Sequence, residues 1–306
     1  MKIAIIGRTE ILFKTAIHLR AVGHTIVCIL TAKAAPEYTH TALDFENLAL
    51  EWEIPFVQGA RIGEHLGFLR EAGADIGVSV NYPGVIPQAI IDLFPLGIIN
   101  AHGGDLPRYR GNACQAWAIL NGENRVGLCI HKMISGELDS GDIVARDYLQ
   151  IDHSTKVTKV WEWMQTRTPS LILEAVNKLG NDSTYFLERQ SSDPRDALRC
   201  YPRRAEDGKI DWNKSAIEIL RLINACNKPY HGAFCCYNSE KMIIWDAQLV
   251  DEYENFCAIP GQVTRIEQGL VEVACSLGKL RVLCVEYLGV IKSPDYWVRS
   301  VRVRFD

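Results

Sequence analysis

The sequence predicts an α/β protein in which a doubly wound parallel sheet is followed by a smaller β-rich domain. Strand and helix patterns alternate along the first half of the chain, which is typical of a parallel sheet with helices on both faces. A polar, turn-rich stretch then interrupts this alternation at residues 191–196. Beyond it, short β-rich runs separated by turn signals indicate a small barrel or an open β-domain.

The expected strands of the first half are short apolar runs, and the helices between them carry apolar residues at helical spacing. In the first helix Ile11, Ala16 and Leu19 lie on one face, and Gly23 follows just past its end. The expected strands are Lys2–Ile6, Thr25–Thr31, Ile54–Val57, Asp75–Val80 and Gly97–Asn100. The expected helices are Glu10–Ala21, Ala42–Trp52, Ile62–Ala72 and Pro87–Leu93.

Two further strands, Val126–Met133 and Ile143–Ile151, are expected on either side of a loop that holds Asp139. A long helix is expected at Ser154–Lys178. These elements complete a first domain that we place at residues 1–190.

The polar stretch is expected to be a linker at about 191–200, and residues 201–306 to be a smaller, OB-like β domain. This domain opens with one amphipathic helix, at Ser215–Asn227. Its expected strands are Ala233–Tyr237, Lys241–Trp245, Gly261–Ile266, Leu270–Ala274 and Lys279–Tyr287.

Composition limits the classes of partner. The chain has 306 residues, enough for two domains, and a formal net charge of −4. Residues 201–306 hold fourteen Lys/Arg against fourteen Asp/Glu, so no basic stripe marks a surface that would grip a polyanion. We therefore expect no nucleic-acid partner.

The ten cysteines form no C-x-x-C pair and lie mostly in apolar segments. This pattern predicts reduced core cysteines in a cytoplasmic protein, without disulfides or a metal site. Residues Met1–Gly7 lack the length and cleavage site of a signal peptide, and no apolar run reaches the ~18 residues of a membrane span. We expect no membrane partner.

Asn100, His102 and Asp139 are the candidate catalytic residues. On an extended segment Asn100 and His102 point the same way, because strand side chains alternate. A carboxylate beside an imidazole stabilises the imidazolium and sets its tautomer, while an amide N–H can donate to an oxygen that becomes negative. No Ser or Cys nucleophile is needed when the substrate supplies the attacking group, so direct acyl transfer to an amine is indicated. A polar strand end without catalytic role is the open alternative.

The segment after His102 strengthens the catalytic interpretation. Gly103 and Gly104 allow the backbone to pass close to a ligand, and Pro107 stiffens the turn. Asp139 lies between Gly136 and Gly141, where its carboxylate can turn toward the histidine.

At these residues the chain resembles the folate-dependent formyltransferases, the family that includes the methionyl-tRNA formyltransferase-like enzymes. Ile99–Gly111 resembles the family's Asn-x-His…Leu-Pro-x-x-Arg-Gly signature, and Leu138–Ile143 resembles its Asp-x-Gly-x-Ile loop. Asp211–Phe234 is similar to the start of the C-terminal domain of longer members. The resemblance covers the whole chain. It implies a Rossmann-like catalytic domain, 10-formyltetrahydrofolate as donor, an amine acceptor, and catalytic roles for the three candidate residues.

The resemblance also implies a folate pocket between the loop that follows Asp75–Val80 and the loop of Asp139. Backbone groups there would read a pterin edge, and Val85, Ile86 and Leu106 would form the walls. For Val85 and Ile86 plain core packing is the open alternative. The donor-binding residues carried over are Tyr82, Gly84, Val85, Ile86, Leu106, Pro107, Gly136 and Leu138. One departure is that the family's common Ser-Leu-Leu-Pro stretch here begins Gly104-Asp105.

The acceptor separates three branches of the family. The glycinamide ribonucleotide branch is usually a single short domain, whereas this chain has about a hundred further residues. The methionyl-tRNA branch must hold RNA, yet the loop Ala32–Asp44 has Lys33 as its only Lys/Arg. We therefore expect the third branch, which formylates a deoxyamino sugar linked to dTDP, UDP or GDP, for surface polysaccharides such as the lipopolysaccharide O-antigen. Methionyl-tRNA formyltransferase is the alternative, and a non-catalytic nucleotide-sugar-binding protein the lesser one.

The substrate-binding candidates are Arg110, Trp117 and Tyr230. Trp117 could stack on a base, although a buried helix tryptophan explains it better. His131 lies in a segment, Ile130–Met133, that looks more like the sugar-modifying members, although a hydrogen-bonded strand histidine explains its side chain better. Gly7–Glu10 lacks G-x-G-x-x-G, which argues against a dinucleotide oxidoreductase. The second domain could serve a homodimer.

Overall fold

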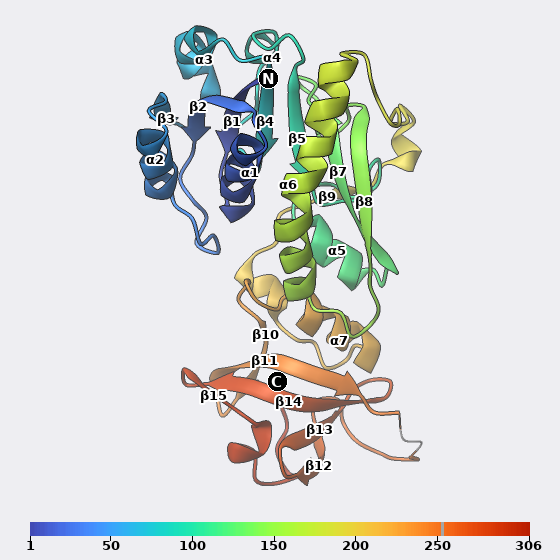
Figure 1. The fold of residues 1–306 in the computed structure, drawn as a ribbon. Coiled ribbons are helices and arrows are strands. Elements are labelled where there is room, and N and C mark those ends of the chain that lie inside the picture. Colours follow the sequence, from blue (N-terminus) through green and yellow to red (C-terminus); the bar gives the residue numbers. More distant parts are fainter. Residues whose placement is uncertain (252–253) are drawn as a thin grey trace. The chain divides into compact units, whose positions relative to one another are not determined.

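The computed structural model of the chain describes residues 1–251 and 254–306, which form two compact units (Figure 1). The first unit comprises residues 1–114, 126–149 and 161–200, and the second comprises 115–125, 150–160 and 201–306. Two short segments that we placed in the first domain therefore belong to the second unit. Hydrogen bonds explain this, because the main chain of residues 150–160 bonds to other parts of that unit: Ile151 N–H donates to the Asn124 carbonyl over 2.9 Å, and the Asn224 amide donates to the His153 carbonyl over 2.8 Å.

The first unit is built on a seven-stranded sheet in the order β3-β2-β1-β4-β5-β7-β8. The pairs β3–β2, β2–β1, β1–β4 and β4–β5 are parallel, and β5 pairs antiparallel with β7. This confirms the α/β fold class, with an antiparallel strand added at the side of the sheet that carries the candidate residues. The strands are β1 (Lys2–Gly7), β2 (Thr25–Thr31), β3 (Phe56–Gln58), β4 (Ile76–Val80), β5 (Ile98–His102), β7 (Arg125–Lys132) and β8 (Ile143–Gln150).

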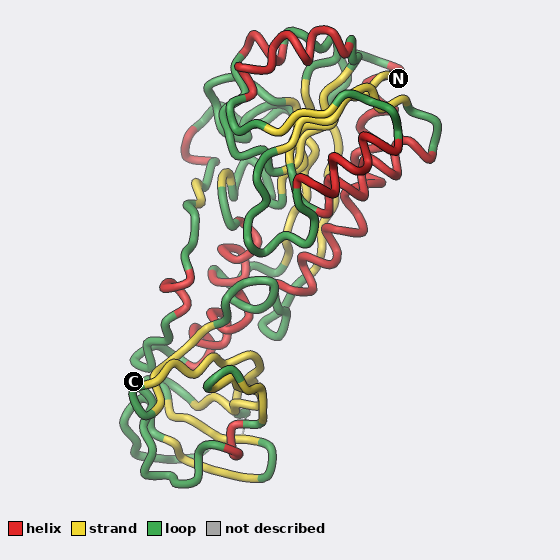
Figure 2. The backbone as a smooth tube through the Cα atoms, turned by 90° about the vertical axis from the view of Figure 1, so that its left-hand side faces the viewer, coloured by secondary structure: helices red, strands yellow, loops and turns green. Residues whose placement is uncertain are grey.

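Helices cover both faces of this sheet, as the tube drawing in Figure 2 shows for the strands in yellow and the helices in red. Strand β1 is buried from Ile3 to Gly7, and its apolar side chains pack against helices. The helices of this unit are α1 (Glu10–Ala21), α2 (Ala42–Glu51), α3 (Leu66–Ala72), α4 (Gln88–Ile91) and most of α6 (Val157–Asn181), whereas α5 (Cys114–Leu120) lies almost entirely in the second unit. A parallel pair of short strands, β6 (Arg110–Gly111) and β9 (Arg199–Cys200), adds to this unit.

Most element boundaries agree with the sequence prediction to within three residues, and the long helix α6 shows the cause of one such shift. We expected it from Ser154, but it begins at Val157. The Asp152 carboxylate accepts hydrogen bonds from the Ser154 amide over 2.9 Å and the Thr155 hydroxyl over 3.0 Å. These contacts form a turn that competes with the first helical turn.

The second unit contains a six-stranded sheet in the order β10-β11-β14-β13-β12, with β15 paired to β14. All of its strand pairs are antiparallel, which confirms the expected β-rich domain. The strands are β10 (Ala233–Tyr237), β11 (Glu240–Leu249), β12 (Val263–Glu267), β13 (Leu270–Ala274), β14 (Lys279–Tyr287) and β15 (Val290–Lys292). Helix α7 (Ala216–Ala225) begins at a capping box made by Ser215 and Glu218, and its apolar face packs on the sheet.

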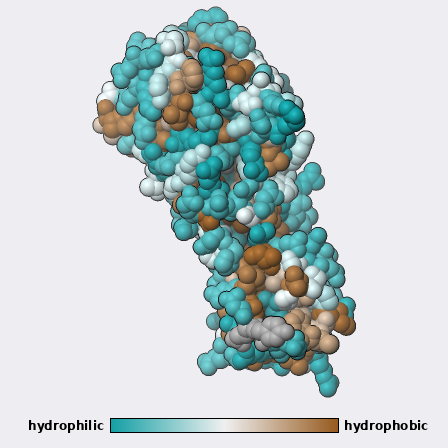
Figure 3. Space-filling view, turned by 90° about the vertical axis from the view of Figure 1, so that its right-hand side faces the viewer, coloured by the Kyte–Doolittle hydropathy of each residue, from teal (hydrophilic) through white to brown (hydrophobic). Residues whose placement is uncertain are grey.

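Strand β11 extends four residues beyond the expected end at Trp245, because a bulge there shifts the register and lets pairing continue. The face in Figure 3 is mostly hydrophilic, with hydrophobic residues gathered in small patches. All ten cysteines are free, and Cys257 is exposed. No helix in the described ranges combines the length and the apolar composition needed to cross a bilayer.

Candidate active site

Strand β5 brings two of the candidate residues to the end of the sheet. Asn100 lies directly opposite His131 of β7, and Ala101, between Asn100 and His102, pairs with Val80 of β4. His102 is buried, whereas Asn100 is half-buried. Because β5 continues to His102, both side chains stand on regular strand backbone and point the same way.

Asp139 reaches this place from the loop between β7 and β8, as expected. Its Oδ2 atom lies 3.4 Å from His102 Nδ1 and accepts a hydrogen bond from the Gly111 amide over 2.9 Å. Its Oδ1 atom lies 3.4 Å from Nε2 of His131. The structure therefore brings the three predicted residues together and adds a second histidine.

The backbone of Asp139 has φ 47°, a left-handed conformation that Asp tolerates better than most residues. The Gln190 amide maintains this turn, because it donates to the Asp139 carbonyl over 2.8 Å and to the Gly141 carbonyl over 2.7 Å. Arg110 in turn donates to Gln190 Oε1 over 2.9 Å.

The environment of Asp139 favours its charged form. Burial opposes ionisation, but the charge of His102, the adjacent His131 ring and the Gly111 amide outweigh it and lower the pKa of Asp139 below its ordinary value. The loop therefore presents a stable carboxylate to both histidines.

Both ring nitrogens of His102 face oxygen acceptors. Nε2 lies 2.6 Å from the carbonyl oxygen of Tyr109, while Nδ1 faces Asp139. These two contacts fix the orientation of the His102 ring, which is held between the Tyr109 carbonyl and the Asp139 carboxylate.

The predicted donor-binding residues divide into buried and exposed members. Ile86 and Leu106 are almost fully buried and pack in apolar clusters, so core packing is the better account of Ile86. Val85 is 80% exposed. Tyr82 is half-buried, and its hydroxyl donates to the Gly59 carbonyl over 3.0 Å.

The remaining donor-binding candidates lie in the two loops. Pro107 follows a cis peptide bond, and Gly84 is tightly packed, because a Cβ there would come within 3.0 Å of the Ala60 carbonyl. Gly136 and Leu138 are exposed on the loop of Asp139, where a ligand could reach them.

The unusual Asp105 has a structural partner. Its carboxylate lies 3.6 Å from Arg146 of β8, whose guanidinium also pairs with Glu188 over 3.1 Å and donates to the Leu106 carbonyl. The departure from the family pattern thus anchors the loop that follows β5.

The predicted substrate residues are divided between the two units. Arg110 lies in the first unit beside the loop of Asp139, whereas Trp117 and Tyr230 belong to the second unit. The Trp117 indole donates to the Tyr201 carbonyl over 2.9 Å, and the guanidinium of Arg203 lies 5.1 Å from the ring centroid. These contacts favour the structural account of Trp117.

The sequence does not assign a place in the site to two residues that lie there. A hydrogen-bonded strand histidine is the better account of His131 from sequence alone, and only the register of β5 against β7 reveals that it faces Asn100. Gln190 lies in no motif, because the chain brings it back to the loop of Asp139 only after a long helix. Among the described residues, no group of three or more His, Cys, Asp or Glu side chains is arranged to hold a metal ion.

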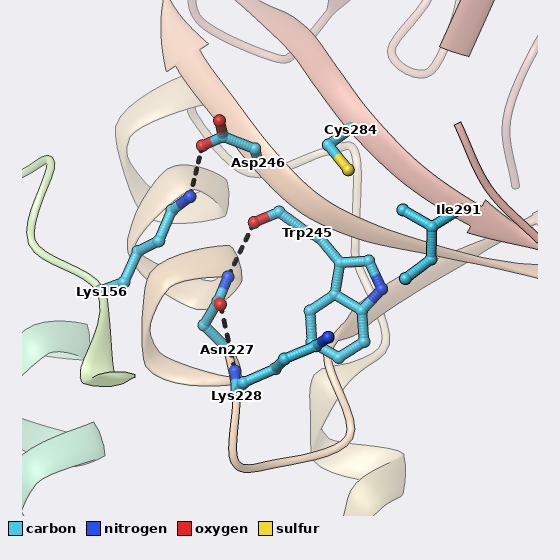
Figure 4. Close-up of a pocket in the computed structure, with 7 residues that line it drawn as sticks. All are labelled: Lys156, Asn227, Lys228, Trp245, Asp246, Cys284 and Ile291. Atoms are coloured by element: carbon cyan, nitrogen blue, oxygen red, sulfur yellow. Dashed lines mark hydrogen bonds and ion pairs between the residues drawn. The ribbon is translucent and has the colours of Figure 1, made fainter. Parts of the chain in front are cut away.

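A separate hollow of about 280 Å³ lies within the second unit (Figure 4). Lys156 pairs with Asp246 over 2.6 Å, and the Asn227 amide donates to the Trp245 carbonyl over 2.8 Å (dashed lines in Figure 4). None of the predicted site residues lines it; its lining residues are Lys156, Asn227, Lys228, Trp245, Asp246, Cys284 and Ile291.

Comparison with known proteins shows the family of the chain. Residues 1–176 match the family model described as formyl transferase, and residues 203–290 match the formyl transferase C-terminal domain. The methionyl-tRNA formyltransferase of Ruminiclostridium cellulolyticum is 29% identical over 92% of this chain and 90% of its own length. That of Akkermansia muciniphila is 32% identical over 81% of this chain and 79% of its own length.

Among solved structures, the N-formyltransferase from Helicobacter canadensis, in complex with folinic acid and dTDP-3-aminofucose, is similar with a TM-score of 0.70. It is 17% identical and covers 92% of this chain and 99% of its own. The two family matches together span most of the sequence. The chain therefore belongs to the formyl transferase family.

Proposed function

We propose that this chain transfers the formyl group of 10-formyltetrahydrofolate to the amino group of methionyl-tRNA. The observation that carries this acceptor is the likeness to methionyl-tRNA formyltransferases, which extends over 92% of the chain at 29% identity and includes both matched regions. This acceptor is the alternative in our sequence analysis, and the relatives favour it over the nucleotide sugar expected there.

The nucleotide-linked amino sugar is the second candidate acceptor, and two observations favour it. The net charge of −4 and the neutral C-terminal third argue against a surface that binds RNA phosphates. The similar Helicobacter canadensis enzyme was solved with a dTDP-linked amino sugar. Either acceptor carries the primary amine that the reaction requires.

The chemistry follows from the side chains around Asp139. The amine of the acceptor attacks the formyl carbon and forms the new C–N bond, so no covalent bond to the enzyme forms. The bond between the formyl carbon and the folate nitrogen then breaks, and tetrahydrofolate leaves. His102 takes or relays the proton that the amine loses, and this proton ends on the folate nitrogen. The Asn100 amide N–H can stabilise the negative charge that develops on the formyl oxygen. Asp139 keeps the His102 ring oriented and balances its charge. Because two substrates must meet, orientation supplies much of the rate.

The test is to incubate the full chain with 10-formyltetrahydrofolate and separate acceptors: methionyl-tRNA, uncharged tRNA, and amino sugars linked to dTDP, UDP or GDP. Tetrahydrofolate formation is read by absorbance, and the formylated product by mass spectrometry. We expect formyl transfer to methionyl-tRNA and none to uncharged tRNA.

The control variant is His102→Ala, which should lower turnover by at least about 100-fold, the lower end of the effect of losing a general acid–base group. Transfer to an amino sugar alone would move the assignment to the second candidate. Absence of tetrahydrofolate formation with every acceptor would overturn the proposed reaction.

A further inference from the structure

His131 is the least explained residue of the site. It is 2% exposed and stands directly opposite Asn100 in the antiparallel pairing of β5 and β7. Its Nδ1 atom lies 3.0 Å from the Lys132 carbonyl oxygen, and its Nε2 atom lies 3.2 Å from Nδ2 of Asn100. A buried imidazole with partners for both nitrogens has a single fixed orientation.

The partners of His131 identify its tautomer. The Lys132 carbonyl can only accept, so Nδ1 carries the proton. The Asn100 amide nitrogen can only donate, so Nε2 presents its lone pair to it. Nε2 also lies 3.4 Å from Asp139 Oδ1, farther away than the Asn100 nitrogen. The two shorter contacts of the ring fit the tautomer that carries its proton on Nδ1.

This arrangement determines what Asn100 offers to a substrate. An amide NH2 has two hydrogens, and His131 takes one of them, so the other has a defined direction. An Asn side chain without this acceptor can flip its amide group, because the oxygen and nitrogen ends have nearly the same shape. Charged or titratable neighbours of the His131 ring are Asp139 and His102, whose ring centroid lies 6.3 Å away.

We infer that His131 is a positioning residue, which directs the Asn100 amide N–H toward the formyl oxygen by accepting the other amide hydrogen. The inference rests on the proposed formyl transfer. It goes beyond the Asn, His and Asp set, because it assigns a role to a side chain that acts through Asn100.

The first experiment is a double-mutant cycle with His131→Leu and Asn100→Ala, measured as the single-turnover rate of tetrahydrofolate formation. His131→Leu should lower this rate by about 10- to 100-fold, up to the effect of losing an oxyanion donor, with little change in KM. In the Asn100→Ala background the same change should cost less than about 3-fold, because residues that act as a unit are not additive.

Two variants act as controls. His131→Gln keeps an acceptor oxygen for the Asn100 amide and should restore most of the rate lost in His131→Leu. His24→Leu removes a histidine outside the site and should leave the rate unchanged. Equal losses from His131→Leu in both backgrounds would overturn the inference, as would a loss that disappears only in an Asp139→Asn background, since His131 would then act through Asp139.

The second experiment needs no acceptor. In protein labelled with ¹⁵N-histidine, long-range proton–nitrogen spectra should show neutral His131 protonated on Nδ1 near pH 7. A proton on Nε2 would overturn the inference even if formyl transfer is confirmed. If no acceptor is formylated but the Nδ1 proton is found, the proposed reaction fails while the His131–Asn100 contact stands.

Discussion

Asp139 shows how one residue organises the site. Its backbone adopts φ 47°, which constrains the main chain. Its carboxylate lies beside two histidines and accepts a hydrogen bond from the Gly111 amide, and these contacts favour its charge. A conformation that costs free energy at a single residue persists only where its surroundings support it. Gln190 provides that support through two backbone carbonyls.

The charge of Asp139 predicts an acid-sensitive stability. Because the folded-state pKa lies below the ordinary value, the carboxylate stabilises the fold above the unfolded pKa of about 3.9. This contribution is lost as pH falls toward the folded pKa. We expect the urea midpoint of the wild type to exceed that of Asp139→Asn most at pH 7, and the difference to shrink between about pH 4 and pH 3. A difference that stays constant with pH would contradict the lowered pKa.

At the scale of elements, the segment between β5 and β6 folds back on His102, the candidate catalytic histidine. The Tyr109 carbonyl oxygen lies 2.6 Å from His102 Nε2. Arg146 pairs with Asp105 and so anchors the start of the segment. Gly104 allows the backbone to lie against the His102 ring, because a Cβ there would be 2.6 Å from Nε2.

This packing predicts the effect of Gly104→Ala. The added methyl would lie closer than 3.0 Å to both Nε2 of His102 and the Tyr109 carbonyl, so the ring or the segment must move. A displacement of about 1 Å can cost about 100-fold in rate, and we expect a kcat loss of that order. Steady-state formyl transfer measures it. Gly67→Ala is the matched control, since nothing lies within 4 Å of its added methyl. Equal kcat values for the two variants would contradict the proposed packing.

For the whole molecule, charge is the property that separates the acceptors. Several cations of the second unit already have carboxylate partners: Lys156 pairs with Asp246, Lys279 with Glu254 and Arg281 with Glu272. Cations engaged in this way contribute less to the grip on a phosphate backbone than unpaired ones. If tRNA is bound, few phosphates are expected to contact this unit.

The salt dependence of formyl transfer tests this. Each phosphate contact contributes about −0.9 to the slope of log affinity against log salt on a duplex, so a few contacts give a slope of about −2 to −4. We expect log kcat/KM for methionyl-tRNA to follow such a shallow slope between about 50 and 200 mM KCl. A slope steeper than about −6 would indicate an extended basic surface and contradict this charge argument.

The sequence by itself determined the elements and the candidate triad, because both depend on local patterns. Apolar runs predicted β10, β13 and β14 with their observed bounds, and strand alternation predicted that Asn100 and His102 share a face. The tertiary structure alone decided the contacts around them. The antiparallel pairing of β5 with β7 put His131 opposite Asn100, and the return of the chain brought Gln190 to Asp139. Such contacts join residues up to 51 positions apart, and their geometry depends on how strands pair, which no local periodicity encodes.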